Sequence, residues 1–139
     1  DAAVLENAAF EEIGRDVAMQ IAALNPTYLN PEAVPEDAIE KEKQILIAQI
    51  KNDPKHAGKP ENILEKMVMG KISKFHETYT LTNQEFVKDN SFTVKKYVDS
   101  KAKELGGAVT IAQFVRFEKG DGLEKRQDDF AQEVASMVK

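Results

Sequence analysis

Residues 35–77 read PEDAIEKEKQILIAQIKNDPKHAGKPENILEKMVMGKISKFHE, and the predicted fold is built around this segment. Apolar residues recur at helical spacing on both sides of a polar middle, at Ile39, Leu46 and Ile50 and then at Leu64, Val68, Ile72 and Phe75. The middle, residues 52–60, holds two prolines and a glycine, which continue a helix poorly. The pattern therefore predicts an antiparallel coiled-coil hairpin of two helices.

Two prolines mark where these helices start. Pro35 and Pro60 each suit the first turn of the helix that follows, because a missing N–H costs nothing where no intrahelical acceptor exists. The two apolar stripes leave water only by facing each other or another chain. The residues alone leave open whether the hairpin pairs within one chain or between two.

The flanking sequence predicts a helical core. Residues 7–24 form an amphipathic helix with Asn7 as its cap, and residues 25–34 form an extended connector anchored by Tyr28 and Leu29. After the hairpin, residues 78–88 are expected to be extended. A second core helix follows, capped by Ser91 or Thr93 and carrying the apolar residues Val94, Val98, Ala102 and Leu105.

The last part of the chain carries the strongest strand pattern. Residues 109–118 alternate, with Val109, Ile111, Val115 and Phe117 on one face and Phe114 on the other. A final helix is expected from Asp128. The predicted fold is α+β and mostly helical, with helices packed on a small, incomplete antiparallel sheet. Its parts are a core subdomain (1–34 and 78–126), the hairpin (35–77) and a carboxy-terminal module (127–139).

Composition excludes several classes of function. The 139 residues suffice for one domain with a protruding arm, and a net charge of −5 does not favour nucleic-acid binding. The absence of cysteine fits a reducing compartment, and we expect a cytoplasmic protein without a membrane span. Because the chain opens with Asp1 rather than methionine, we also expect a fragment or a processed form.

No motif for catalysis stands out. His56 and His76 lie twenty residues apart, too far for a helical metal pair, and we predict neither a metal nor a cofactor. The run Gly120-Asp121-Gly122 lacks the third glycine of a dinucleotide loop and reads as a turn. The serines lack a neighbouring histidine, and the carboxylates lie on helix faces where solvated acids are routine. The sequence therefore predicts a protein that is not an enzyme.

The remaining features favour recognition of a protein partner through helix faces and a strand edge. The candidate contact residues are Ile39, Leu46, Ile50, Leu64, Val68, Ile72, Phe114, Phe117, Phe130 and Val134. For any one of these residues, core packing is the commoner role. A lone strand also has unpaired edges, which missing strands or a second copy of the chain would satisfy, so a homodimer is a further expectation.

Four runs of residues resemble the bacterial translation elongation factor Ts family. They are AMQIAA at 18–23, GKPENILEKMV at 58–68, QEFVKD at 84–89 and FVRFEKGDGLEK at 114–125, and they follow the family's order. The resemblance implies a guanine-nucleotide exchange factor that binds elongation factor Tu, loosens its magnesium and GDP site, and lets GTP replace GDP. It further implies the carboxy-terminal part of the family, with 39–75 as the protruding coiled-coil hairpin and 129–134 within the carboxy-terminal module. Residues 109–117 would be a strand of the second core subdomain.

The chain also departs from the family pattern. It contains no Thr-Asp-Phe-Val run, the element that the resemblance associates with exchange. The sequence-based hypothesis is that the chain binds elongation factor Tu weakly and exchanges nucleotide poorly. Two other interpretations remain, a structural or adaptor module whose hairpin mediates self-association and, more remotely, a small hydrolase that uses carboxylates.

Overall fold

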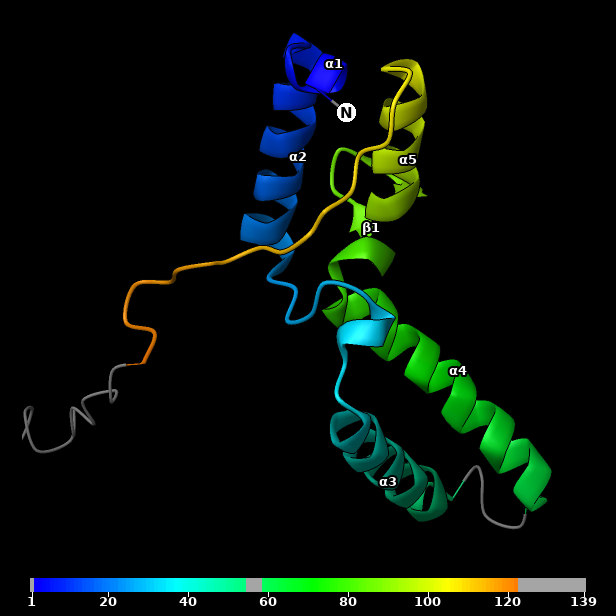
Figure 1. The fold of residues 1–139 in the computed structure, drawn as a ribbon. Helices are drawn as coiled ribbons and strands as arrows, with labels where there is room; N and C mark the ends of the chain where they lie inside the picture. The colour runs from blue at the N-terminus through cyan, green and yellow to red at the C-terminus, as the bar shows by residue number, and fades with distance from the viewer. Residues whose placement is uncertain (1, 55–58, 123–139) are drawn as a thin grey trace, which may run out of the picture.

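The computed structural model describes residues 2–54 and 59–122. In chain order its elements are α1 (Ala2–Leu5), α2 (Ala8–Leu24), the 3₁₀ helix η1 (Pro31–Ala33), α3 (Glu36–Asn52), α4 (Glu61–Tyr79), the 3₁₀ helix η2 (Leu81–Asn83), β1 (Glu85–Phe86), β2 (Asp89–Thr93) and α5 (Val94–Glu104) (Figure 1). We call α3 and α4 the arm, and α1, α2, η2, β1, β2 and α5 the body. The described chain is mostly helical with one small antiparallel sheet, as the sequence predicted.

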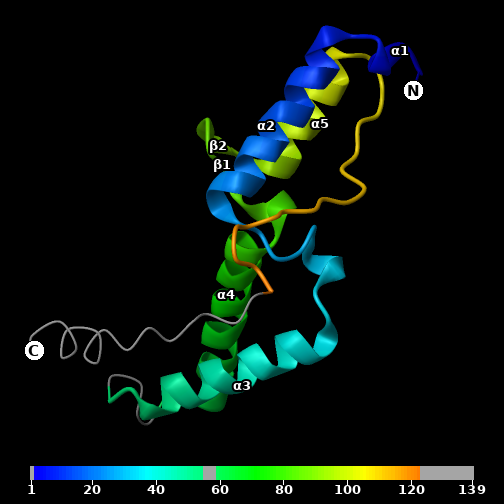
Figure 2. The same cartoon turned by 90° about the vertical axis from the view of Figure 1, so that its left-hand side faces the viewer.

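The core of the body lies between α2 and α5, which run beside each other (Figures 1 and 2). Its buried members are Ile13, Val17, Ile21, Leu81, Val94 and Val98. The first three are spaced by four residues and so lie on one face of α2, as do the last two on α5. Helical periodicity therefore located the α2 and α5 members of this core, but not Leu81, which lies in η2.

Side-chain caps set where the two body helices begin. Asn7 accepts a hydrogen bond from the Ala9 N–H at 3.0 Å, which confirms the predicted start of α2. Thr93 accepts from the Lys96 N–H at 3.3 Å and caps α5. Of the two predicted caps for this helix, Thr93 is therefore the one used, while Ser91 lies in β2.

The connector between body and arm also holds the base of α4. Asn25 adopts a left-handed conformation with φ 46° and ends α2. The N–H groups of Thr27 and Tyr28 then donate to the Tyr79 carbonyl at 2.9 and 3.0 Å, and the Leu81 N–H donates to the Tyr28 carbonyl. Leu29 packs against the core. Of the two predicted anchors, Tyr28 thus bonds to both the arm and the body, while Leu29 packs on the body.

The arm consists of two helices, as the sequence predicted. The helix α3 ends at Asn52 and α4 begins at Glu61, with Pro35 and Pro60 directly before the two helices. The coiled coil itself is not confirmed, because α3 crosses α4 obliquely (Figure 2). A physical reason is that Lys43 falls between Ile39 and Leu46 on the facing side of α3, where a coiled coil needs an apolar residue.

The predicted strand at 109–118 is wrong. Residues 108–118 form neither helix nor strand, and within residues 2–54 and 59–122 the only sheet is the hairpin of β1 and β2. The β pattern therefore finds no neighbouring edge to pair with. Phe114 is also misplaced by the prediction, because it packs against the core together with Val109 and Ile111. Val115 and Phe117 are exposed instead.

The extended segment predicted at 78–88 is wrong in its first part. The helix α4 continues through Tyr79, and η2 follows at Leu81–Asn83. Only Thr80 makes a β contact there, an isolated parallel bridge with Tyr28. In the second part, Glu85 and Phe86 are extended as predicted and form β1, whereas residues 87–88 turn the chain into β2, a strand that was not predicted. The β-prone threonines and Tyr79 are overruled by the helical hydrogen bonds of α4, which Thr78 and Thr80 join through their side chains.

Candidate partner-binding surface

The arm buries only part of its predicted apolar stripes. Leu46 and Ile50 of α3 and Val68 of α4 are buried, and α3 and α4 are in contact. Ile39, Leu64 and Ile72 are half-buried. The stripes are therefore buried only in part, which leaves apolar surface available elsewhere on the arm.

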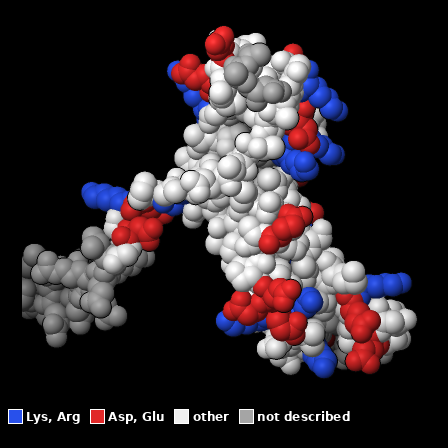
Figure 3. All heavy atoms as spheres, in the orientation of Figure 1, with Lys and Arg blue, Asp and Glu red and all other residues white. Residues whose placement is uncertain are grey.

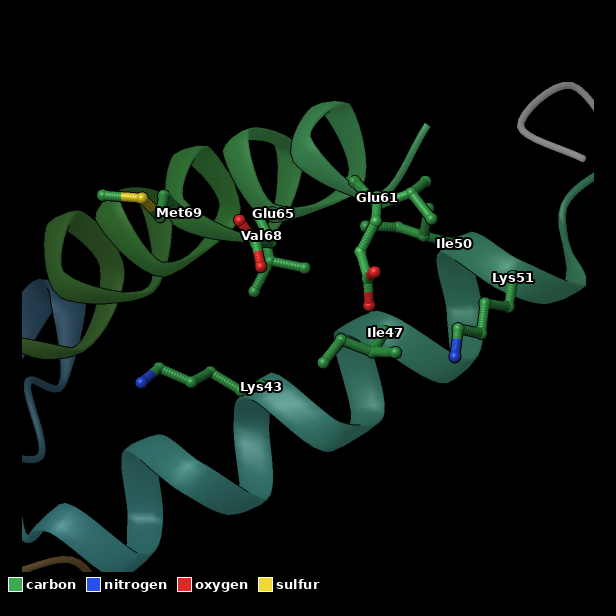
Figure 4. A pocket seen from close by; sticks show the side chains of 9 residues that line it. Lys43, Ile47, Ile50, Lys51, Glu61, Glu65, Val68 and Met69 are labelled. Carbon is green, nitrogen blue, oxygen red and sulfur yellow. The ribbon is translucent and has the colours of Figure 1, made fainter. Parts of the chain in front are cut away.

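A groove with a volume of about 390 Å³ lies between the two helices of the arm (Figure 4). Its apolar lining consists of Ile47, Ile50, Leu64, Val68 and Met69. The helices are close near Ile50 and Glu61 and farther apart near Lys43 and Met69, so the groove opens toward the body (Figure 4). An apolar floor between two rigid helices is the kind of surface onto which a partner helix or loop docks.

Charged residues of opposite sign line the two walls of this groove. Lys43 and Lys51 come from α3, and Glu61 and Glu65 come from α4 (Figure 4). Lys43 lies 3.9 Å from Glu40 of its own helix, and the pair is too exposed to add much stability. The rim is therefore electrically balanced, with one basic and one acidic side that can orient a charged partner.

The apolar lining of the groove includes side chains that water reaches. Met69 is 72% exposed and Ile47 is 40% exposed. Ile45 and Ile63 are also exposed on the arm. Exposed apolar side chains occur on the body as well, for example Leu24 and Phe92, so it is the position of Ile47 and Met69 in a groove that indicates a contact surface.

Sequence reasoning missed Ile47 and Met69. The signal for Ile47 was present, since Ile45, Leu46 and Ile47 are consecutive and one face of a helix cannot hide all three. Helical spacing predicted Leu46, which is buried, and did not predict its exposed neighbours Ile45 and Ile47. For Met69 a similar signal lay in the run Met67-Val68-Met69.

The other predicted contact residues lie away from the arm. Phe114 packs against the body, whereas Phe117 is 93% exposed, so the two are not members of one surface. Phe130 and Val134, and the carboxy-terminal module at 127–139, lie outside the described residues. The structure therefore does not bring the ten predicted residues together.

Charged side chains of both signs are mixed over the arm and the far end of the body, while the middle of the face in Figure 3 carries few charges. No single-sign patch dominates that face, which agrees with the net charge of −5. Among the described side chains, no group of three or more His, Asp or Glu is placed to hold a metal ion. None of the helices in the described ranges is long and apolar enough to cross a membrane.

The body contains one buried charge, on Asp16 of α2. Its carboxylate accepts from Lys88 Nζ at 2.6 Å and from the Tyr97 hydroxyl at 2.6 Å. Burial alone would raise the pKa of Asp16, but the hydrogen bonds from Lys88 and Tyr97 outweigh it and hold that pKa below its ordinary value. Burial, together with the bond to Asp16, raises the pKa of Tyr97 far above its ordinary value. Since Tyr97 also stacks on Phe86 with ring centroids 4.1 Å apart, the group joins α2, α5 and β1.

Comparison with known proteins identifies the family. The family profile described as Elongation factor TS matches residues 2–121, nearly all of the chain. The chain belongs to the elongation factor Ts family. The match confirms the resemblance that the four sequence runs had indicated.

Two curated relatives show how much of the family protein this chain represents. Elongation factor Ts of Clostridium botulinum strain Alaska E43 is 48% identical over 134 residues, which cover 96% of this chain and 43% of the relative. Elongation factor Ts of the strain ATCC 19397 is 47% identical over 129 residues, covering 93% of this chain and 41% of the relative. The chain thus spans less than half the length of these relatives.

One expectation from the resemblance is not upheld. The chain was expected to represent the carboxy-terminal part of the family and to end in the family's carboxy-terminal module at 127–139. The matched segment instead corresponds to the amino-terminal part of the family, and the match stops at residue 121, before the expected module. The family assignment therefore rests on the body and the arm, and the module receives no support from this match.

Proposed function

We propose that this chain binds elongation factor Tu and that the groove of the arm is part of the contact surface. The proposal is supported by membership of the elongation factor Ts family together with one observation on the arm. That observation is an apolar groove whose lining includes Ile47 and Met69, both open to water. Burying such side chains against a partner supplies about 25 cal/mol for each Å² of apolar surface removed from water.

The family exchanges GDP for GTP on elongation factor Tu, and we assign this chain a share in that activity rather than the whole of it. Residues 1–139 contain no Thr-Asp-Phe-Val run, the element associated with exchange in the resemblance. The body and arm would then contribute affinity and position. Chemistry that makes or breaks bonds is not part of the proposal, and a translation factor of this kind acts in the cytoplasm.

Binding can be tested with elongation factor Tu carrying a fluorescent GDP. The chain should bind the complex, and the double variant Ile47→Ser with Met69→Ser should bind at least about tenfold more weakly, because both exposed groove side chains lose apolar area. A double variant on α5 of the body, Lys95→Ser with Lys103→Ser, serves as the control. Equal binding by both double variants would rule out the groove.

The same sample reports on exchange. We expect the unaltered chain to accelerate release of the fluorescent GDP only weakly. Acceleration as large as that of a complete elongation factor Ts would show that exchange does not need the missing run. It would contradict the proposal that this chain contributes binding affinity and position but little exchange activity.

Self-association through the arm is a second candidate function, favoured by the exposed Ile45 and Ile63 outside the groove. In that case the arm would make a homodimer, and the chain would act as a structural or adaptor module. Sedimentation at rising concentration separates the two functions. A monomer that binds elongation factor Tu supports the first, whereas a dimer that Ile45→Ser with Ile63→Ser makes monomeric supports the second.

A further inference from the structure

Two glutamine side chains lie completely inside the molecule where the arm meets the body. Gln20 of α2 is 0% exposed and Gln84, directly after η2, is 2% exposed. A primary amide carries two donor hydrogens and an acceptor oxygen, so burying it is costly unless these groups find partners. Buried amides of this kind are kept only where their hydrogen bonds fix something.

Both amides are fully used in hydrogen bonds. Gln84 Nε2 donates to the Thr78 carbonyl at 2.8 Å and lies 3.5 Å from the Leu24 carbonyl. Gln20 Nε2 donates to Gln84 Oε1 at 3.2 Å and to the Glu85 carbonyl at 3.0 Å. Gln20 Oε1 accepts from the Val87 N–H at 2.8 Å.

These hydrogen bonds connect the body with the arm. Thr78 lies in the last turn of α4, and Leu24 is the last residue of α2. Gln84 therefore connects the end of a body helix with the base of an arm helix, while Gln20 holds Gln84 and the β1–β2 turn in place. The backbone bonds from Thr27 and Tyr28 to Tyr79 meet the same end of α4 from the connector.

We propose that the Gln20–Gln84 pair fixes the direction in which the arm leaves the body, and so positions the arm for its partner. A helix end held only by backbone bonds from the connector can still pivot about them. The second attachment, through the buried amide of Gln84, removes that freedom. The effect on a partner rests on the proposed function, whereas the effect on the arm direction does not.

The direction of the arm can be measured because the sequence contains no cysteine. Ala18→Cys in α2 and Lys66→Cys in α4 place spin labels at two exposed positions, one on the body and one on the arm. Pulsed electron spin resonance then gives the distribution of distances between the labels. In the labelled chain we expect one narrow distribution.

The test variant is Gln84→Met, which keeps most of the side-chain volume and removes the donors to Thr78 and Leu24. Its distance distribution should broaden and shift, and binding to elongation factor Tu should weaken about tenfold. The matched control is Val98→Ala, which destabilises the same body core without touching the pair. The control should leave the distribution unchanged, so a shift in Gln84→Met alone separates positioning from general loss of stability.

An unchanged distribution in folded Gln84→Met would overturn the proposal. A second measurement, on the unaltered chain, applies even where this variant does not fold. The side-chain NH₂ groups of Gln20 and Gln84 should exchange with deuterium far more slowly than a free amide, and exchange at the free rate would likewise overturn it. Failure of the labelled, unaltered chain to bind elongation factor Tu would contradict the proposed function. The distances between the labels would still test the proposal on the direction of the arm.

Discussion

The body and the arm use the same sequence pattern in different ways. In the body, α2 and α5 pack on each other and on Leu81, and the middle of the α2 stripe and the first turns of α5 are buried, although Leu24 at the end of α2 is exposed. In the arm, Leu46, Ile50 and Val68 are buried, but Ile45, Ile47, Ile63 and Met69 remain exposed. A helix pair that has more apolar surface than it can bury is incomplete by itself.

The polar interactions of the two regions also differ. The body adds buried polar bonds to its apolar core, at Asp16 and at the Gln20–Gln84 pair. On the described part of the arm, ion pairs such as Lys41 with Asp37 lie on the surface and contribute little. We therefore expect substitutions in the body core to lower the stability of the fold. Substitutions on the arm surface should leave stability nearly unchanged but weaken partner binding.

The largest expected effect contrasts two leucines. Leu81→Ala in the body core should lower the free energy of unfolding by about 2–5 kcal/mol, because a fully buried side chain leaves a cavity. Leu46→Ala in the arm should cost less and act locally, since one side of that helix pair is open to solvent. Chemical unfolding measures the first, and hydrogen exchange along α3 and α4 measures the second. Equal global losses from both would show that body and arm unfold as one unit.

A smaller effect is expected at the buried charge of the body. Asp16→Asn keeps the shape but removes the charge, and it should cost about 1–2 kcal/mol at neutral pH, since Lys88 can return to water while Tyr97 keeps a weaker bond. The folded pKa of Asp16 lies below its unfolded value of 3.8, so its contribution is present above pH 3.8 and is lost as pH falls through the folded pKa. Urea unfolding from pH 6 to pH 2 measures it. The variant should lose less stability across that acidic range than the unaltered chain, and parallel curves would contradict this assignment.

The smallest effect on stability is expected for substitution of Ile47, the neighbour of the buried Leu46. Ile47→Ser should change the free energy of unfolding by no more than about 0.5 kcal/mol, although its neighbour Leu46 is buried. Thermal unfolding followed by circular dichroism is the measurement. A loss as large as that of Leu46→Ala would mean that the groove is packed shut in solution, and the contrast between a complete body and an incomplete arm would fail.

Much of the fold could be predicted from local sequence. Asn7, Pro35, Pro60 and Thr93 mark the starts of the four long helices, and their roles depend only on backbone groups one to three residues away. The apolar stripes of α2 and α5 could be predicted from helical periodicity, which likewise depends only on residues close in sequence. The strand at 109–118 failed because a strand exists only with a neighbour, and no local pattern shows whether that neighbour is present.

The candidate site was predicted less well, for a related reason. Periodicity selects the residues that a helix buries, and Leu46 and Val68 were found in this way. A contact surface consists of what remains exposed after that burial, and Ile47 and Met69 became visible only once α3 and α4 were placed against each other.

Patterns along the chain were sufficient to predict the family, the positions of the long helices and the helical residues of the body core, because these depend on matching residues and on local spacing. The divergence of the arm helices, the apolar lining of the groove and the contact of Gln20 with Gln84 became known only from the folded arrangement. Those facts depend on contacts between separate segments of the chain, up to the 64 positions between Gln20 and Gln84, and packing rather than local preference fixes such contacts.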